Sequence, residues 1–369
     1  MRHLPLLLTL AACTSNVAPA KDALTDDSAV TANDTGDGAD DTGAAGDDTH
    51  DTGATGDDTD SGGDDTGTTG DDTDSGGDDS GATEDDTASG DDTASGGDDT
   101  GLDDTGGATA GDYTQTGPYM VTVTTGTEDL GNGCAMGWDR YEPDVAPVGF
   151  IVLAHGFQRT RVNMADWADH LASWGFDVVA PDLCHASVLD TDHAQNGADL
   201  VLLAAALGDG APLYIGQSAG GLAGLLAASQ DSTTRAVLGL DAVDDNTGLG
   251  LAAAPSIAAP VYGLVGESSL CNASNNGVAV YAAAPQGLAL RVTEADHCDF
   301  ENPTDWGCEL LCTGTNAQFT DEQLRATIGG MTTAFALWQS GAAADGADWW
   351  TSGGAEYDAL VADGALSTP

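Results

Sequence analysis

A serine between two glycines is the first feature of the sequence that could do chemistry. The segment GQSAG (216–220) has the G-x-S-x-G spacing that places a nucleophilic serine on a sharp turn. The chain holds 51 glycines, so these five letters need support from their surroundings. The apolar run 212–216 predicts a strand before the serine, and the small, apolar residues 219–229 predict a helix after it. Since such a serine needs a strand, a tight turn and a helix, we expect Ser218 to be a nucleophile.

A nucleophilic serine needs a base, and the order of the histidines narrows the choice. Of the seven histidines in the chain, only His297 follows Ser218. It lies just beyond the apolar segment LALRV (288–292), where a loop can return an imidazole to the edge of a sheet. We therefore expect His297 to act first as general base and then as general acid.

Three carboxylates could orient this histidine. Asp241 ends the apolar run 236–240, and Asp244 lies one short turn further on. Glu267 ends the next apolar run, which begins near residue 261. A carboxylate at the end of a strand also commonly caps the helix that follows. The residue pattern leaves the three as alternatives.

Two main-chain N–H groups are expected to stabilise an oxyanion. One belongs to Ala219, directly after the nucleophile and at the positive end of the predicted helix. The other belongs to Phe157, in the loop after the apolar run that ends in His155 and Gly156. We expect Gly156 to allow a close approach of the backbone and His155 to be structural.

The elements that must position these residues alternate between strand and helix after residue 113, which predicts an α/β domain with a mainly parallel sheet and helices on both faces. Residues 119–125 and 136–143 are expected to form antiparallel strands before it. Residues 148–156 and 176–183 read as buried parallel strands. A helical face of apolar residues runs over 164–174. A capping box at Thr320 and Gln323 begins a long helix with a core-facing stripe, and the tail after residue 341 gives no functional signal.

The first 112 residues predict an exported, anchored protein. Residues 1–12 are typical of a short signal peptide, and LAAC (10–13) resembles the bacterial lipobox, whose cysteine is lipidated. Residues 13–112 are rich in Asp, Thr and Gly and hold nearly half of the 61 acidic residues, so we expect a disordered acidic tether. Residues 113–369 then form the α/β domain. The expected location is the bacterial cell envelope, with Cys13 as the lipid anchor in the outer membrane, or secretion.

Charge and composition exclude several partners. Residues 113–369 carry 6 arginines and no lysine against 31 acidic residues, a formal charge of −25. Nucleic acids and anionic lipid surfaces are therefore not expected to bind, because both need positive protein surface. We expect contact with a membrane only through the anchor at Cys13. Neither a metal nor an organic cofactor is expected.

Six cysteines remain after Cys13, an even number that predicts up to three disulfides in an exported domain. Six cysteines allow 15 connectivities. We expect a Cys271–Cys298 bond that pins the histidine loop, because both residues follow strands that should end at the same sheet edge. Cys308 with Cys312 and Cys134 with Cys184 would then pair. Zinc is the weaker interpretation, since no C-x-x-C pair is present.

Several blocks of the sequence resemble the α/β-hydrolase superfamily, in particular its chlorophyllase-like branch, which is akin to cutinase-type polyester hydrolases. The blocks are LAHGF, WADHLASWGFDVVAPDL, GQSAGG, LGLDAVD, EADHCDF and IGGMTTAFALW, within residues 135–340. The block around Asp241 is similar to the acid-bearing segment of that branch, and this favours Asp241 over Glu267. Gln217, Ala219 and Asp296 depart from the branch, which has His, Arg and Gly there.

This resemblance implies a serine hydrolase that cleaves small or polymeric carboxylic esters through an acyl-enzyme, with a Ser218, His297 and Asp241 triad. The alternative is a surface-displayed module that keeps the fold for binding without catalysis, because a fold alone does not determine function.

Overall fold

The computed structural model describes residues 111–312, 314 and 317–369. The expectations for the signal peptide, for lipidation of Cys13 and for the acidic tract up to residue 110 lie outside these residues. Tyr113 is buried near the start of the described part, where its ring contacts those of Trp174 and Trp349. No helix within the described ranges is long and apolar enough to cross a membrane.

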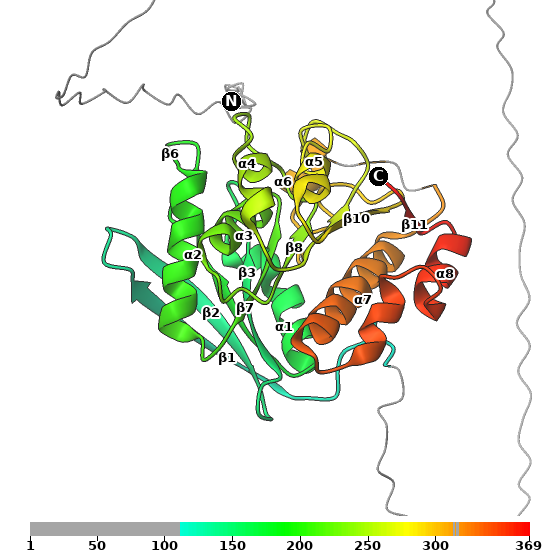
Figure 1. The fold of residues 1–369 in the computed structure, drawn as a ribbon, viewed down its shortest axis with the longest axis horizontal. Helices are drawn as coiled ribbons and strands as arrows, with labels where there is room; N and C mark the ends of the chain where they lie inside the picture. Colours follow the sequence, from blue (N-terminus) through cyan, green and yellow to red (C-terminus); the bar gives the residue numbers. More distant parts are fainter. Residues whose placement is uncertain (1–110, 313, 315–316) are drawn as a thin grey trace, which may run out of the picture. The chain divides into compact units, whose positions relative to one another are not determined.

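A nine-stranded sheet runs through the domain in the order β1-β2-β4-β3-β7-β8-β9-β10-β11 (Figure 1). The six strands from β4 to β10 in this order are parallel, whereas β1, β2 and β11 are antiparallel to their neighbours. The mainly parallel α/β sheet and the antiparallel strands before it are thus confirmed. The strands are β1 Val121–Asp129, β2 Ala135–Pro143, β3 Gly149–Ala154, β4 Phe176–Pro181, β7 Pro212–Gln217, β8 Ala236–Leu240, β9 Val261–Val265, β10 Gly287–Val292 and β11 Leu366–Ser367, with β5 Ala186–Ser187 and β6 Asp190–Thr191 in a separate hairpin.

Helices cover both faces of the sheet. On one side lie α1, α7 and α8, and on the other α2 and α3 (Figure 1). The helices are α1 Ala165–Ser173, α2 His193–Leu207, α3 Ala219–Gln230, α4 Leu249–Ala253, α5 Val278–Ala283, α6 Trp306–Cys312, α7 Asp321–Ser340 and α8 Ala355–Ala362, with short 3-10 helices at Arg161–Met164, Ala254–Ser256 and Ala344–Trp349.

Strand β3 shows why the central strands have continuous apolar runs. Ile151 and Leu153 point into the core under α1 and α7. Phe150 and Val152 point into the second core, under α2 and α3. Because side chains alternate along a strand and both faces are covered, every position of β3 must be apolar.

The C-terminal part of the chain completes the first core. Helix α7 begins with the expected capping box, in which the hydroxyl of Thr320 accepts the N–H of Gln323 and the Gln323 side chain accepts the N–H of Thr320. The tail, whose role the sequence left open, buries Trp350 against Phe335 of α7. It then adds β11 to the edge of the sheet beside β10.

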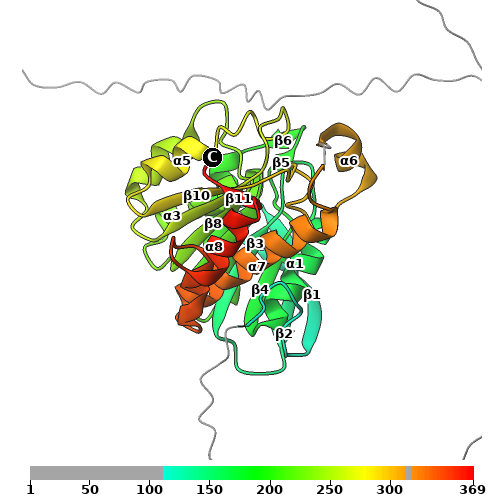
Figure 2. The same ribbon diagram turned by 90° about the vertical axis from the view of Figure 1, so that its right-hand side faces the viewer.

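The loops that follow the parallel strands gather at one end of the sheet, together with α6 (Figure 2). In parallel sheets this carboxyl edge is where ligands commonly bind, because all the strand ends point to it. Ser218, Asp241 and His297 all lie in these loops.

Candidate active site

Ser218 sits on a sharp turn between β7 and α3. Its backbone has φ 53° and ψ −120°, a left-handed conformation that non-glycine residues rarely adopt. The N–H of Ser218 donates to the carbonyl of Leu240 at 3.0 Å, which ties the turn to β8. Such strain persists only where the surrounding structure enforces it, and it is common at functional sites.

The glycines on either side of Ser218 are required by close packing. A Cβ on Gly216 would lie 2.4 Å from the carbonyl carbon of Gly220. A Cβ on Gly220 would lie 2.4 Å from the carbonyl oxygen of Ala154, in β3. Real Cβ atoms do not approach backbone so closely, so any larger residue would open the turn. The G-x-S-x-G spacing therefore reflects the geometry of the strand–turn–helix unit.

His297 and Asp241 are in direct contact. Nδ1 of His297 lies 2.6 Å from Oδ2 of Asp241, and both side chains are buried. A carboxylate can only accept, so Nδ1 carries the proton in the neutral ring and Nε2 keeps its lone pair. The expected histidine and one of the three expected carboxylates therefore meet at the carboxyl edge of the sheet.

The Asp241 carboxylate is held by three further donations. The N–H of Gly266 donates to Oδ1 at 2.9 Å. The amide of Asn272 donates to Oδ2 at 3.1 Å and, more weakly, to Oδ1 at 3.4 Å. Asn272 is fully buried and also bonds to the carbonyl of Glu267. Sequence reasoning missed Asn272, whose one signal is its place in the Asn-rich segment 272–276 behind β9.

The other two carboxylates have different partners. Asp244 accepts the N–H groups of Gly250 and Leu251 at 2.7 and 3.0 Å, and so caps the short helix α4. Glu267 is exposed and accepts the N–H of Glu294 at 3.1 Å. Neither contacts His297 among the described residues, so the structure places only Asp241 in the position of an orienting acid.

The two main-chain N–H groups expected to stabilise an oxyanion are those of Phe157 and Ala219. In the described part of the chain, the N–H groups of Phe157 and Ala219 donate to no acceptor. The first N–H groups of a helix lack partners within the helix, which explains the free N–H of Ala219. Gly156 lies close to the turn, because a Cβ there would be 3.1 Å from Cβ of Ser218. These two donors are available to a ligand oxygen.

His155 braces this loop from within. Its Nε2 accepts the N–H of Leu183 at 2.9 Å, so Nδ1 carries the proton and donates to the carbonyl of Gly156 at 2.7 Å. Burial lowers the pKa of His155, which keeps the ring neutral. The partners of His155 are thus main-chain groups, in keeping with a structural role.

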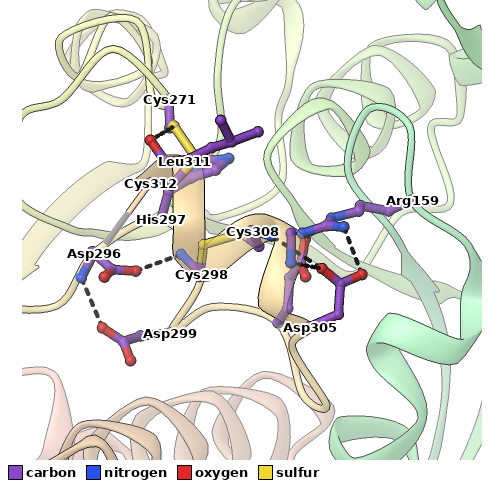
Figure 3. Close-up of a disulfide and its surroundings, with 12 residues drawn as sticks. Arg159, Cys271, Asp296, His297, Cys298, Asp299, Asp305, Cys308, Leu311 and Cys312 are labelled. Atoms are coloured by element: carbon purple, nitrogen blue, oxygen red, sulfur yellow. Dashed lines mark hydrogen bonds and ion pairs between the residues drawn. A yellow bond between two sulfur atoms is a disulfide. The ribbon is translucent and has the colours of Figure 1, made fainter. Parts of the chain in front are cut away.

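An ion pair joins the loop after β3 to the histidine segment. Arg159 donates to Glu301 at 2.6 Å. It also donates to Asp305 at 3.0 Å (Figure 3). Glu301 is buried, and burial raises its pKa while Arg159 opposes this shift. Arg159 therefore links the segment that carries Phe157 to the segment that carries His297.

The structure confirms one expected disulfide and corrects two. Cys134 is bonded to Cys184. The expected Cys271–Cys298 bond is wrong, because Cys271 is bonded to Cys312 and Cys298 to Cys308. The expected local pair of Cys308 with Cys312 is wrong for the same reason.

The helix α6 explains the difference. It carries Cys308 and Cys312 one turn apart, and side chains four residues apart on a helix point the same way rather than toward each other. Cys308 reaches the histidine loop and Cys312 reaches the loop after β9, so that α6 is bonded to both (Figure 3). The histidine loop is pinned, as expected, but by a partner on α6.

The lone pair of His297 faces a residue that the sequence did not single out as part of the site. The amide nitrogen of Gln217 lies 3.2 Å from Nε2 of His297. Among the described residues, the hydroxyl of Ser218 makes no hydrogen bond to this ring. In structures without substrate, catalytic hydrogen bonds are often not yet formed. The candidate active site therefore consists of the His297–Asp241 pair and, next to it, Ser218 in its strained backbone conformation.

Comparisons with known proteins give no family for this chain. No protein-family model matches it, and no curated protein matches it.

Proposed function

We propose that the domain is a serine hydrolase that cleaves carboxylic esters through an acyl-enzyme. The contact that carries this proposal is the 2.6 Å hydrogen bond between His297 and Asp241, buried beside the strained turn of Ser218. The serine turn, the acid and the histidine follow each other in the chain order typical of the α/β-hydrolase superfamily. We propose membership of that superfamily on this order and on the mainly parallel sheet.

In the proposed reaction, Oγ of Ser218 attacks the ester carbonyl carbon while Nε2 of His297 takes the hydroxyl proton. Asp241 holds His297 in the tautomer with a proton on Nδ1 and stabilises the imidazolium that forms. The N–H groups of Phe157 and Ala219 donate to the oxyanion. His297 then gives its proton to the leaving alcohol. Water, activated by the same histidine, attacks the acyl-enzyme and frees Ser218.

A panel of p-nitrophenyl esters, from acetate to long acyl chains, tests the proposed function on the full chain. We expect turnover of at least one ester, with release of p-nitrophenol that follows enzyme concentration. The matched control is Ser218→Ala, prepared in the same way. If the wild type hydrolyses no ester faster than Ser218→Ala, the chain is a non-catalytic module and the proposal is wrong.

The disulfides provide a prediction that separates activity from stability. The Cys298–Cys308 bond spans 10 residues and the Cys134–Cys184 bond spans 50. Loop entropy makes these bonds worth about 3 and about 4 kcal/mol of unfolding free energy. Only the first adjoins His297. We therefore expect Cys298→Ser/Cys308→Ser to lose more esterase activity, and Cys134→Ser/Cys184→Ser to lose more stability.

Ester turnover at 25 °C and the midpoint of urea unfolding measure the two quantities on the same samples. If the less stable of the two variants is also the less active, the Cys298–Cys308 bond does not position the histidine loop.

A further inference from the structure

Gln217 lies between the serine turn and the histidine. The residue is only 1% exposed. Its amide nitrogen is 3.2 Å from Nε2 of His297 and 3.4 Å from the carbonyl oxygen of the same residue. Oε1 of Gln217 is buried without a hydrogen-bond partner among the described residues, and it fills the space beside Gly156. A buried amide with one orphaned end is costly, so its orientation calls for a reason.

The contacts at His297 decide which way the amide points. The carbonyl of His297 can only accept, so the end of the Gln217 side chain that faces it must be the –NH2 group. Nδ1 of His297 donates to Asp241, which leaves a lone pair on Nε2. The network therefore assigns a hydrogen bond from the amide of Gln217 to Nε2 of the neutral ring.

This hydrogen bond depends on the charge of the ring. When Nε2 is protonated, its N–H points at the amide N–H, and the bond becomes a repulsion. Gln217 therefore favours the neutral imidazole, which is the form that can act as a base. The same amide also occupies the lone pair that would take the proton of Ser218.

We propose that Gln217 is a positioning residue that caps Nε2 of His297 in the resting enzyme. It holds the ring neutral and in place until the hydroxyl of Ser218 takes over the lone pair as substrate binds. This role rests on the proposed serine hydrolase function, because Gln217 can give up Nε2 of His297 to Ser218 only if Ser218 is the nucleophile.

Other charged groups lie near the His297 ring, and the substitutions at position 217 do not change them. Asp241, in the loop after β8, faces Nδ1. Glu301, on the histidine's own segment, interacts with His297 through space and is paired with Arg159 from the loop after β3. Because substitutions at position 217 leave these groups in place, a change in titration reports the contact with Gln217.

Two substitutions of similar size alter the donor. Gln217→Met removes the hydrogen bond, and Gln217→Glu replaces the donor with an acceptor that favours the imidazolium. NMR of ¹⁵N-histidine in the full chain follows the titration of His297, assigned with His297→Gln. We expect the midpoint to rise by about 0.5–1 pH unit in Gln217→Met, which is what one hydrogen bond is worth. Gln217→Glu should raise it further.

Two controls separate the contact from general packing. Gln230→Met removes an amide at the other end of α3, where it donates to Leu226, and should leave the titration unchanged. Gln217→Asn keeps an amide but is one methylene shorter, so it should behave like Gln217→Met. If Gln217→Met fails to fold, Gln217→Asn takes its place in the comparison with the wild type.

The rate at which a fluorophosphonate labels Ser218, measured at a series of pH values, shows whether the change at His297 affects the nucleophile. We expect the low-pH limb of this rate profile to move with the NMR midpoint. Equal midpoints in the wild type, Gln217→Met and Gln217→Glu overturn the cap, even where Ser218 is labelled normally. If the midpoints shift as expected but Ser218 is labelled in no variant, the serine hydrolase function fails, and the hand-over to Ser218 fails with it.

Discussion

Ser218→Ala should reduce kcat/KM for p-nitrophenyl esters by about 10³-fold or more, because it removes the atom that forms the acyl-enzyme. His297→Ala should cost a similar factor, since it removes the base proposed to take the serine proton. The double variant should be little worse than either single one. When two residues act together in one catalytic step, the removal of either one already abolishes their shared contribution.

The matched control for Ser218→Ala is Ser229→Ala. Ser229 lies near the end of α3, where its hydroxyl bonds to the carbonyl of Leu226. This variant should keep wild-type turnover. If Ser218→Ala or His297→Ala retains more than a tenth of the wild-type kcat/KM, the assignment of nucleophile or base is wrong.

The second large effect concerns the acid. Asp241→Asn should lower kcat/KM by about 10²–10⁴-fold while the fold is retained. The asparagine can still accept the N–H of Gly266, but it then presents an N–H to Nδ1 of His297. The ring must turn to the tautomer with the proton on Nε2, and that ring cannot take the proton of Ser218.

Glu267→Gln and Asp244→Asn are the controls, because both remove a charge near the same edge of the sheet. Glu267→Gln should leave turnover near that of the wild type, since Glu267 is exposed and away from His297. Asp244→Asn should lower stability by loosening α4, with activity per folded molecule retained. If either control loses more activity than Asp241→Asn, Asp241 is not the acid that orients His297.

Local patterns predicted the serine turn well. The G-x-S-x-G spacing, the strand before it and the helix after it all follow from contacts within one short segment of chain. The long C-terminal helix is a similar case, because its capping box and its stripe of apolar residues are local signals. Alternating strands and helices likewise predicted the mainly parallel sheet.

Contacts between distant segments could not be read in this way. Strand ends supplied three carboxylates, and only the tertiary structure shows that Asp241 meets His297. The disulfides were misassigned because α6, which had not been predicted, carries two cysteines toward two different loops. The buried amides of Gln217 and Asn272 act through residues far away in the sequence.

The site of covalent modification by a fluorophosphonate tests most directly whether Ser218 is an activated nucleophile. The full chain is treated in its native state, digested, and mapped by mass spectrometry. We expect one adduct, on Ser218, that is lost in His297→Ala and after unfolding, because only the folded site activates this serine. Native protein that carries no adduct, or carries it on another residue, would contradict the proposed role of Ser218 as nucleophile.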